Sequence, residues 1–375
     1  MTHFIPKSIF LINTPAMPRG TSVLKHKSSG FFYASVLSKW MIEFTKPALT
    51  VEQQIELLTE RGLIIRSPDR VARYLEVISF FRLSAYMRPF QESDSSHRFR
   101  PGVCFQQIVE LYAFDRELRL IVMDAAERFE VAMRSAIGNH MGPSYGTHWY
   151  LDKQLFKSDY EHGRLLTEIE DKIKKEERAL EKDIVNIQRS RAPDHIKQQR
   201  IEGRKKENYL RFYPSQYHAP RLLPNWAMLE ELSFGNISHL YQGLAKDSDR
   251  KQIARRFNTP HSVLGSWLHT LTFIRNCCAH HARLWNRELS VPPKLLRAGH
   301  WESIPDRLQP LDIQPGRRIF IVTLILDHLI KQVSPESKWL ERLHELLQKY
   351  PSANREIMGF PDNWQDLMTL GSSTP

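Results

Sequence analysis

The sequence predicts an all-α protein: a helical bundle interrupted by an inserted, highly charged helical hairpin. Three observations support this fold class. Apolar residues recur at three- and four-residue steps over long stretches, strand-type alternation is nearly absent, and helix-capping residues bracket the apolar runs. The chain has 375 residues, 41% of them hydrophobic, which is enough for one large core or two modest cores.

The first two predicted helices carry their own start and stop signals. Thr50 is placed to cap a helix that Gly62 ends, and Ser67 with Pro68 begins a second helix expected to continue to about Arg88. The polar segment 91–104 reads as a loop. Its neighbour "FFRLSAYMRPF" (80–90) has aromatic residues at helical spacing, which favours core packing over the alternative of base stacking.

The longest periodic run covers residues 105–139 and predicts one long amphipathic helix. We expect it to fray near Gly138 and Asn139, which are weak helix formers. Its apolar face is formed by Leu111, Phe114, Leu118, Ile121, Ala125, Phe129, Ala132 and Ala136.

Residues 158–211 differ from the rest because charged residues dominate and apolar positions are sparse. The pattern predicts two helices separated near "RAPD", forming a hairpin. Two interpretations stay open for this hairpin, a solvated charged arm and a surface that tracks RNA phosphates. Further helices are expected from Pro260 and over 318–332 and 336–349. The predicted domains are therefore 43–300, which includes the hairpin, and 301–375, whose helices pack on the bundle and end in a flexible tail.

The net charge of +11 is unevenly distributed, because the first 40 residues hold five Lys or Arg and no acidic residue. We expect residues 1–42 to form a disordered basic arm, with Met41 opening the structured part.

No apolar run is long enough to cross a bilayer, so we expect no membrane partner. Three cysteines cannot build a disulfide framework, which favours a cytoplasmic location.

The segment "IRNCCAHHARLWNR" (274–287) concentrates chemically active side chains. If the helix from Pro260 continues through it, an apolar stripe runs to Leu289. A neighbouring face then carries polar residues at steps of four, three and four, with Arg275 beside the first of them. This polar face consists of Asn276, His280, Arg283 and Arg287.

These residue types suit the cleavage of RNA without a metal ion. An imidazole can exchange the proton of a 2′-hydroxyl or of a leaving 5′-oxygen near neutral pH. A guanidinium stabilises the additional negative charge of the phosphorane-like transition state. The expected products are a 2′,3′-cyclic phosphate and a 5′-hydroxyl, and DNA should not be cut. A homodimer would bring a second acid or base to the reaction.

The same residues resemble a known family. "RNCCAH", Arg275 to His280, fits the R-x4-6-H motif of the HEPN superfamily of metal-independent ribonucleases, with Asn276 as the polar residue that often follows the Arg. The wider chain closely resembles the bacterial abortive-infection (Abi) family in "FFRLSAYMRPF", "FDRELRLIVMDAAERFEVAMRSAIGNHMG", "HWYLD" and "LPNWAMLEELSFGNIS". The resemblance implies a HEPN helical bundle, a role in phage defence, and ribonuclease toxicity restrained by an RNA or protein antitoxin.

The predicted site has three groups of residues, with no cofactor and no metal. Arg275, Asn276 and His280 are assigned to catalysis, and Arg283 and Arg287 to phosphate or RNA binding. The supporting residues are Glu127, Arg134, His140 and His281.

Other interpretations of these residues remain open at this point. The segment is also compatible with an ordinary helix end, with zinc bound by Cys277 and His281, with a cysteine nucleophile, and with a non-catalytic RNA-binding or regulatory module. "RSAIGNH", Arg134 to His140, has the same R-x4-6-H spacing and is either a second half-site or a supporting element, in which Glu130 pairs with the Arg.

Overall fold

The computed structural model describes residues 44–297, 301, 315–362 and 364–369. Over these residues the secondary structure is helical, and β-pairing is limited to isolated bridges, so the all-α prediction is confirmed. The chain divides into two compact units, the first ending at Tyr112 and the second beginning at Ala113. The predicted basic arm, 1–42, and the end of the predicted tail, 370–375, lie outside the described residues.

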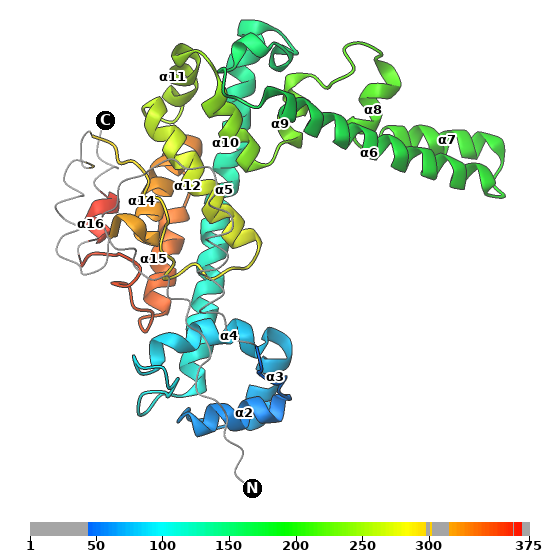
Figure 1. The fold of residues 1–375 in the computed structure, drawn as a ribbon. Helices are drawn as coiled ribbons and strands as arrows, with labels where there is room; N and C mark the ends of the chain where they lie inside the picture. Colours follow the sequence, from blue (N-terminus) through cyan, green and yellow to red (C-terminus); the bar gives the residue numbers. More distant parts are fainter. Residues whose placement is uncertain (1–43, 298–300, 302–314, 363, 370–375) are drawn as a thin grey trace, which may run out of the picture. The chain divides into compact units, whose positions relative to one another are not determined.

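The described part of the first unit contains three short α-helices and the start of a long one (Figure 1). Thr50 caps the first helix through a reciprocal pair of hydrogen bonds with Gln53, as its sequence indicates. The single helix predicted from Pro68 to Arg88 is wrong, because Ser79 breaks it with a φ of 76° and caps the helix that follows. These helices are α2 (Val51–Glu60), α3 (Pro68–Ile78) and α4 (Phe80–Met87).

The second unit is built around the long helix α5 and α14, an apolar helix whose residues are nearly all buried. The predicted runs at 318–332 and 336–349 are confirmed as α14 and α15. Within the described residues, the α-helices of this unit are α5 (Phe105–Tyr145, which begins in the first unit), α6 (His162–Arg189), α7 (Asp194–Lys205), α8 (Tyr209–Gln216), α9 (Asn225–Glu231), α10 (Phe234–Gly243), α11 (Asp247–Arg255), α12 (His261–Ala279), α14 (Ile319–Val333), α15 (Trp339–Lys349) and α16 (Trp364–Thr369).

Helix α5 continues past the point where the sequence predicts fraying, so that prediction is wrong. Gly138 and Gly142 are retained in the helix because Asn225 and Leu229 of α9 pack directly on them. A Cβ on Gly138 would lie 3.2 Å from a Leu229 methyl group, so the two helices approach each other closely only because these positions lack side chains.

The predicted charged hairpin is present as α6 and α7, which contact each other, with α8 packed on α6 (Figure 1). Several of its charges are paired within the hairpin. Arg211 forms ion pairs with Glu176 at 2.8 Å and Asp183 at 3.0 Å, and Arg204 pairs with Glu207 at 2.9 Å. This internal pairing favours the solvated-arm interpretation for that part of the hairpin.

Helix α14 contacts both α12 and α15, which places the C-terminal helices in the same unit as the motif at 274–287. None of the helices in the described part of the chain has the length and apolar character required to cross a membrane.

Candidate functional site

Helix α12 ends at Ala279, so the prediction that it continues through the motif is wrong. His281 has a φ of 55°, and its N–H donates to the Cys278 carbonyl at 3.1 Å. The next N–H, of Ala282, donates to the Cys277 carbonyl at 2.9 Å. Together these bonds form a Schellman motif, which closes a helix by placing one residue in the left-handed conformation. His281 therefore has a backbone role that its spacing in sequence did not indicate.

The turn is fixed by a buried carboxylate on α5. Asp115 is fully buried and accepts the backbone N–H groups of Leu284 at 3.0 Å and Trp285 at 2.7 Å. Arg119 pairs with the same carboxylate and reaches the Ala282 carbonyl at 3.5 Å. These contacts satisfy the backbone groups that a continuing helix would have satisfied itself. Sequence reasoning missed both charged residues, because their partners are backbone groups far away in the chain.

Arg275 is held in place by a second buried carboxylate of α5. Its Nε donates to Glu130 Oε2 at 3.1 Å, while Glu130 Oε1 accepts from Arg134 at 2.7 Å. The Arg275 side chain is 31% exposed, whereas that of Glu130 is 7% exposed. We refer to these three residues as the arginine cluster. Because it contains two guanidiniums and one carboxylate, its net charge is positive, and Arg275 is its most accessible member.

The remaining bonds of the arginine cluster tie it to the surrounding helices. Arg134 is almost fully buried and donates to the carbonyls of Leu229 at 3.0 Å and Leu232 at 2.8 Å. Asn276 is exposed, and its amide oxygen lies 3.5 Å from Arg275. Glu127, which the sequence suggested as an orienting group, is exposed, and Glu130 occupies that position instead.

His140 belongs to a different cluster. Its Nε2 lies 2.9 Å from Asp249 of α11, and the Tyr145 hydroxyl donates to the same carboxylate at 2.9 Å. The two ends of the "RSAIGNH" segment thus contact separate carboxylates, since Arg134 pairs with Glu130. This arrangement corresponds to a supporting role in packing α5 against α9 and α11.

The two histidines of the motif are exposed at the end of α12. The predicted polar face does not extend beyond this point as a helix, because the chain turns after Ala279. Arg287 nevertheless returns to α12: its Nε donates to the Arg283 carbonyl at 2.8 Å, and its guanidinium lies 5.7 Å from the centre of the Phe273 ring. Arg283 is half-buried. The turn thus brings a second guanidinium to the last part of α12 beside Cys277.

Binding of an anion at the end of α12 requires these cations, because the carboxyl end of a helix carries partial negative charge and does not attract anions by itself. Any affinity of this region for phosphate must come from side chains such as Arg275 and Arg287. The exposed imidazole of His280 follows Arg275 by five residues in the chain. The site therefore offers an oriented guanidinium, an accessible imidazole and an amide on one short segment.

The adjacent cysteines are both buried. Burial raises the pKa of Cys277 and raises the pKa of Cys278 to about 12, which keeps both as thiols at neutral pH. This argues against a cysteine nucleophile, since the thiolate is the reactive form. The helical spacing proposed for zinc is also lost, because His281 lies beyond the end of α12. Among the described residues, no group of three or more His, Cys, Asp or Glu side chains is placed to share a metal ion.

The fold is all-α, and exposed polar side chains lie at the end of α12. Two buried carboxylates of α5, Asp115 and Glu130, hold this region in place. The chain matches the model of the Abi-like protein family over residues 73–286, more than half of its length. It therefore belongs to the Abi-like family. No curated protein and no solved structure matches it.

Proposed function

We propose that this protein is an abortive-infection phage-defence factor that cleaves RNA as a metal-independent endoribonuclease of the HEPN type. The defence role is what membership of the Abi-like family suggests. The main support for the ribonuclease activity is the ion pair between Glu130 and Arg275. It orients a partly exposed guanidinium close in the chain to the exposed imidazole of His280.

In the proposed reaction, the 2′-oxygen of one nucleotide attacks the adjacent phosphorus and the bond to the 5′-oxygen breaks. His280 takes the proton of the 2′-hydroxyl or gives one to the leaving oxygen, and the second proton transfer comes from a second copy in a homodimer. Arg275 holds the phosphate and stabilises its transition-state charge. The products are a 2′,3′-cyclic phosphate and a 5′-hydroxyl.

The other predicted residues take positioning roles in this proposal. Asn276 donates to a phosphate oxygen beside Arg275, and Arg287 contacts the RNA backbone from the folded-back loop. Arg283 is an auxiliary phosphate contact. An RNA or protein antitoxin keeps the activity in check until infection.

The test is cleavage of labelled RNA in EDTA. Wild-type protein should cut the RNA, and His280→Ala should lower the rate on the order of 10²- to 10⁴-fold while retaining RNA binding. Arg275→Ala should lower both cleavage and binding, and Arg275→Lys should not restore cleavage, because lysine lacks the forked donors. RNA binding without cleavage, even after addition of infected-cell extract, would support a non-catalytic RNA-binding module instead.

A further inference from the structure

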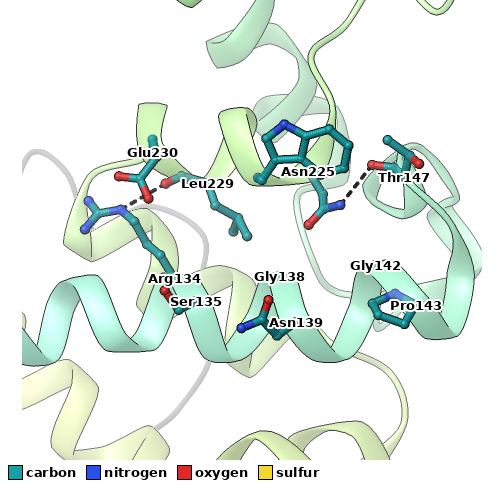
Figure 2. Close-up of a pocket in the computed structure, with 11 residues that line it drawn as sticks. Arg134, Ser135, Gly138, Asn139, Gly142, Pro143, Thr147, Asn225, Leu229 and Glu230 are labelled. Carbon is teal, nitrogen blue, oxygen red and sulfur yellow. Dashed lines mark hydrogen bonds between the residues drawn. The ribbon is translucent and has the colours of Figure 1, made fainter. Parts of the chain in front are cut away.

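A pocket of about 400 Å³ lies between α5 and α9, next to the arginine cluster. This volume falls in the range of roughly 300–1,000 Å³ that is usual for small-ligand sites. Residues of α5, among them Ser135, Gly138 and Gly142, form its floor, and α9 forms the opposite wall (Figure 2). Arg134 lines the pocket and also belongs to the arginine cluster, so the pocket and Arg275 share a structural element.

Asn225 gives the pocket a fixed hydrogen-bonding group. The residue is 3% exposed, and its amide nitrogen donates to the Thr147 carbonyl at 3.2 Å. A Cβ on Gly138 would lie 3.3 Å from the amide oxygen, which therefore faces the helix floor (Figure 2). An amide nitrogen only donates, so the amide oxygen is the atom of Asn225 that can accept from a ligand.

The charges around the pocket favour a neutral ligand over an anion. Arg134 is the cation among the described lining residues, and it already donates to Glu130 and to two backbone carbonyls. The lining also includes the exposed carboxylate of Glu230. A phosphate would meet this carboxylate with little compensation, whereas an N–H or amino group would find two acceptors, Glu230 and the Asn225 oxygen.

Trp226 completes the site. Its side chain is 58% exposed, although an indole is large and is usually mostly buried. It lines the pocket next to Asn225 on the first turn of α9. An exposed indole beside fixed polar groups is suited to stacking on a flat ring while the ring edge is hydrogen-bonded.

We propose that this pocket binds an unpaired nucleobase that carries an amino group. Trp226 stacks on the base, and Glu230 and the Asn225 oxygen accept hydrogen bonds from its edge. This proposal rests on the proposed ribonuclease function: the pocket would select which RNA nucleotide is bound. Arg134 links the pocket to Arg275, which holds the phosphate, through the shared carboxylate of Glu130. Uracil offers a single edge N–H, which can serve only one of the two acceptors, whereas an amino group carries two N–H donors, so uracil should bind less well than adenine, guanine or cytosine.

The test uses free nucleosides, which carry no phosphate and therefore report on the pocket and not on Arg275. Binding of adenosine, guanosine, cytidine and uridine to the full chain is measured by ligand-observed NMR titration. The three amino-bearing nucleosides should bind more tightly than uridine. Trp226→Ala should weaken their binding on the order of tenfold, which is the expected contribution of one base stacked on an aromatic ring.

Two further variants distinguish an effect on the pocket from a loss of folding. Ser135→Trp, at an exposed position of α5, fills the pocket and should abolish nucleoside binding. Leu120→Ala removes a side chain of α5 that is also 58% exposed but lies outside the pocket, so binding should be unchanged. Circular dichroism should show the same helical content in all three variants.

The outcomes separate this proposal from the proposed ribonuclease activity. Unchanged nucleoside binding in Trp226→Ala and Ser135→Trp, absence of binding to wild-type protein, or displacement of the nucleosides by ribose 5-phosphate would overturn the base-binding pocket. His280→Ala should still bind nucleosides. Nucleoside binding by a wild-type protein that does not cut RNA would leave the pocket standing and refute the ribonuclease.

Discussion

Among single residues, the carboxylate that supports Arg275 decides how its guanidinium is oriented. Glu127 and Glu130 are three positions apart on α5, and only Glu130 faces the interior where it contacts two arginines. The sequence predicted Glu127 as the supporting carboxylate, and Glu130 only as the ion-pair partner of Arg134. The choice depends on how α5 packs on α9 and α12, which periodicity alone does not determine.

We expect Glu130→Gln to destabilise the protein by roughly 3 kcal/mol, because two guanidiniums would lose their shared buried carboxylate. Glu127→Gln is the matched control on the exposed side of the same helix and should change the stability by less than about 0.5 kcal/mol. Urea unfolding followed by circular dichroism measures both. Equal effects would show that Glu130 does not hold the arginine cluster together.

The reactivity of Cys278 tests the exclusion of a cysteine nucleophile. Since burial raises its pKa to about 12, iodoacetamide at pH 8 should modify Cys278 far more slowly in the native protein than in urea. Mass spectrometry of tryptic peptides after timed quenching gives the rates. Rapid modification of the native protein would restore the cysteine-nucleophile interpretation.

At the scale of elements, the sequence located helix starts better than helix ends. Thr50 and Pro260 were recognised because their start signals are local. The end of α12 has no Gly or Pro at the turn, and the long-range bonds from Asp115 hold the chain that follows it. Of the candidate site, the sequence therefore proposed Arg275, Asn276 and His280. It also paired Glu130 with Arg134, as the structure does, but it missed Asp115 and the bond of Glu130 to Arg275.

The left-handed conformation of His281 gives a test of the Schellman motif. His281→Gly should stabilise the protein by about 1 kcal/mol, because glycine adopts this conformation without steric cost. His280→Gly is the matched control, since His280 has a φ of −90° and gains no such relief. Chemical unfolding compares the two.

The same pair separates backbone from chemical roles. His281→Gly should retain RNA cleavage and His280→Gly should lose it. Loss of cleavage in His281→Gly, with normal folding and stability, would move the acid or base role to His281.

At the scale of the whole molecule, the family match spans both compact units, so the Abi-like sequence is not confined to the unit that carries the site. The sequence predicted that α6 to α8 are rich in charged residues, but not which of these charges pair. Ion pairing across the hairpin depends on how its helices align. The division after Tyr112 falls inside α5, where the sequence gives no linker signal.

The proposed reaction predicts that the active species is a homodimer. The specific RNA-cleaving activity should fall as the protein is diluted below the concentration at which dimers dissociate, and the two midpoints should coincide. Light scattering and cleavage assays over the same dilution series provide the comparison. If monomers in solution keep the same activity per chain, the second copy takes no part in the reaction.

Two RNA substrates compared in EDTA show whether this protein cuts RNA by attack of the 2′-hydroxyl. One is an all-ribose strand, and the other carries a single 2′-deoxy nucleotide on the 5′ side of the cleaved bond. We expect wild-type protein to cut only the first strand and to leave a 2′,3′-cyclic phosphate, and we expect His280→Ala to lose this activity. Equal cutting of both strands by the wild-type protein would contradict this expectation.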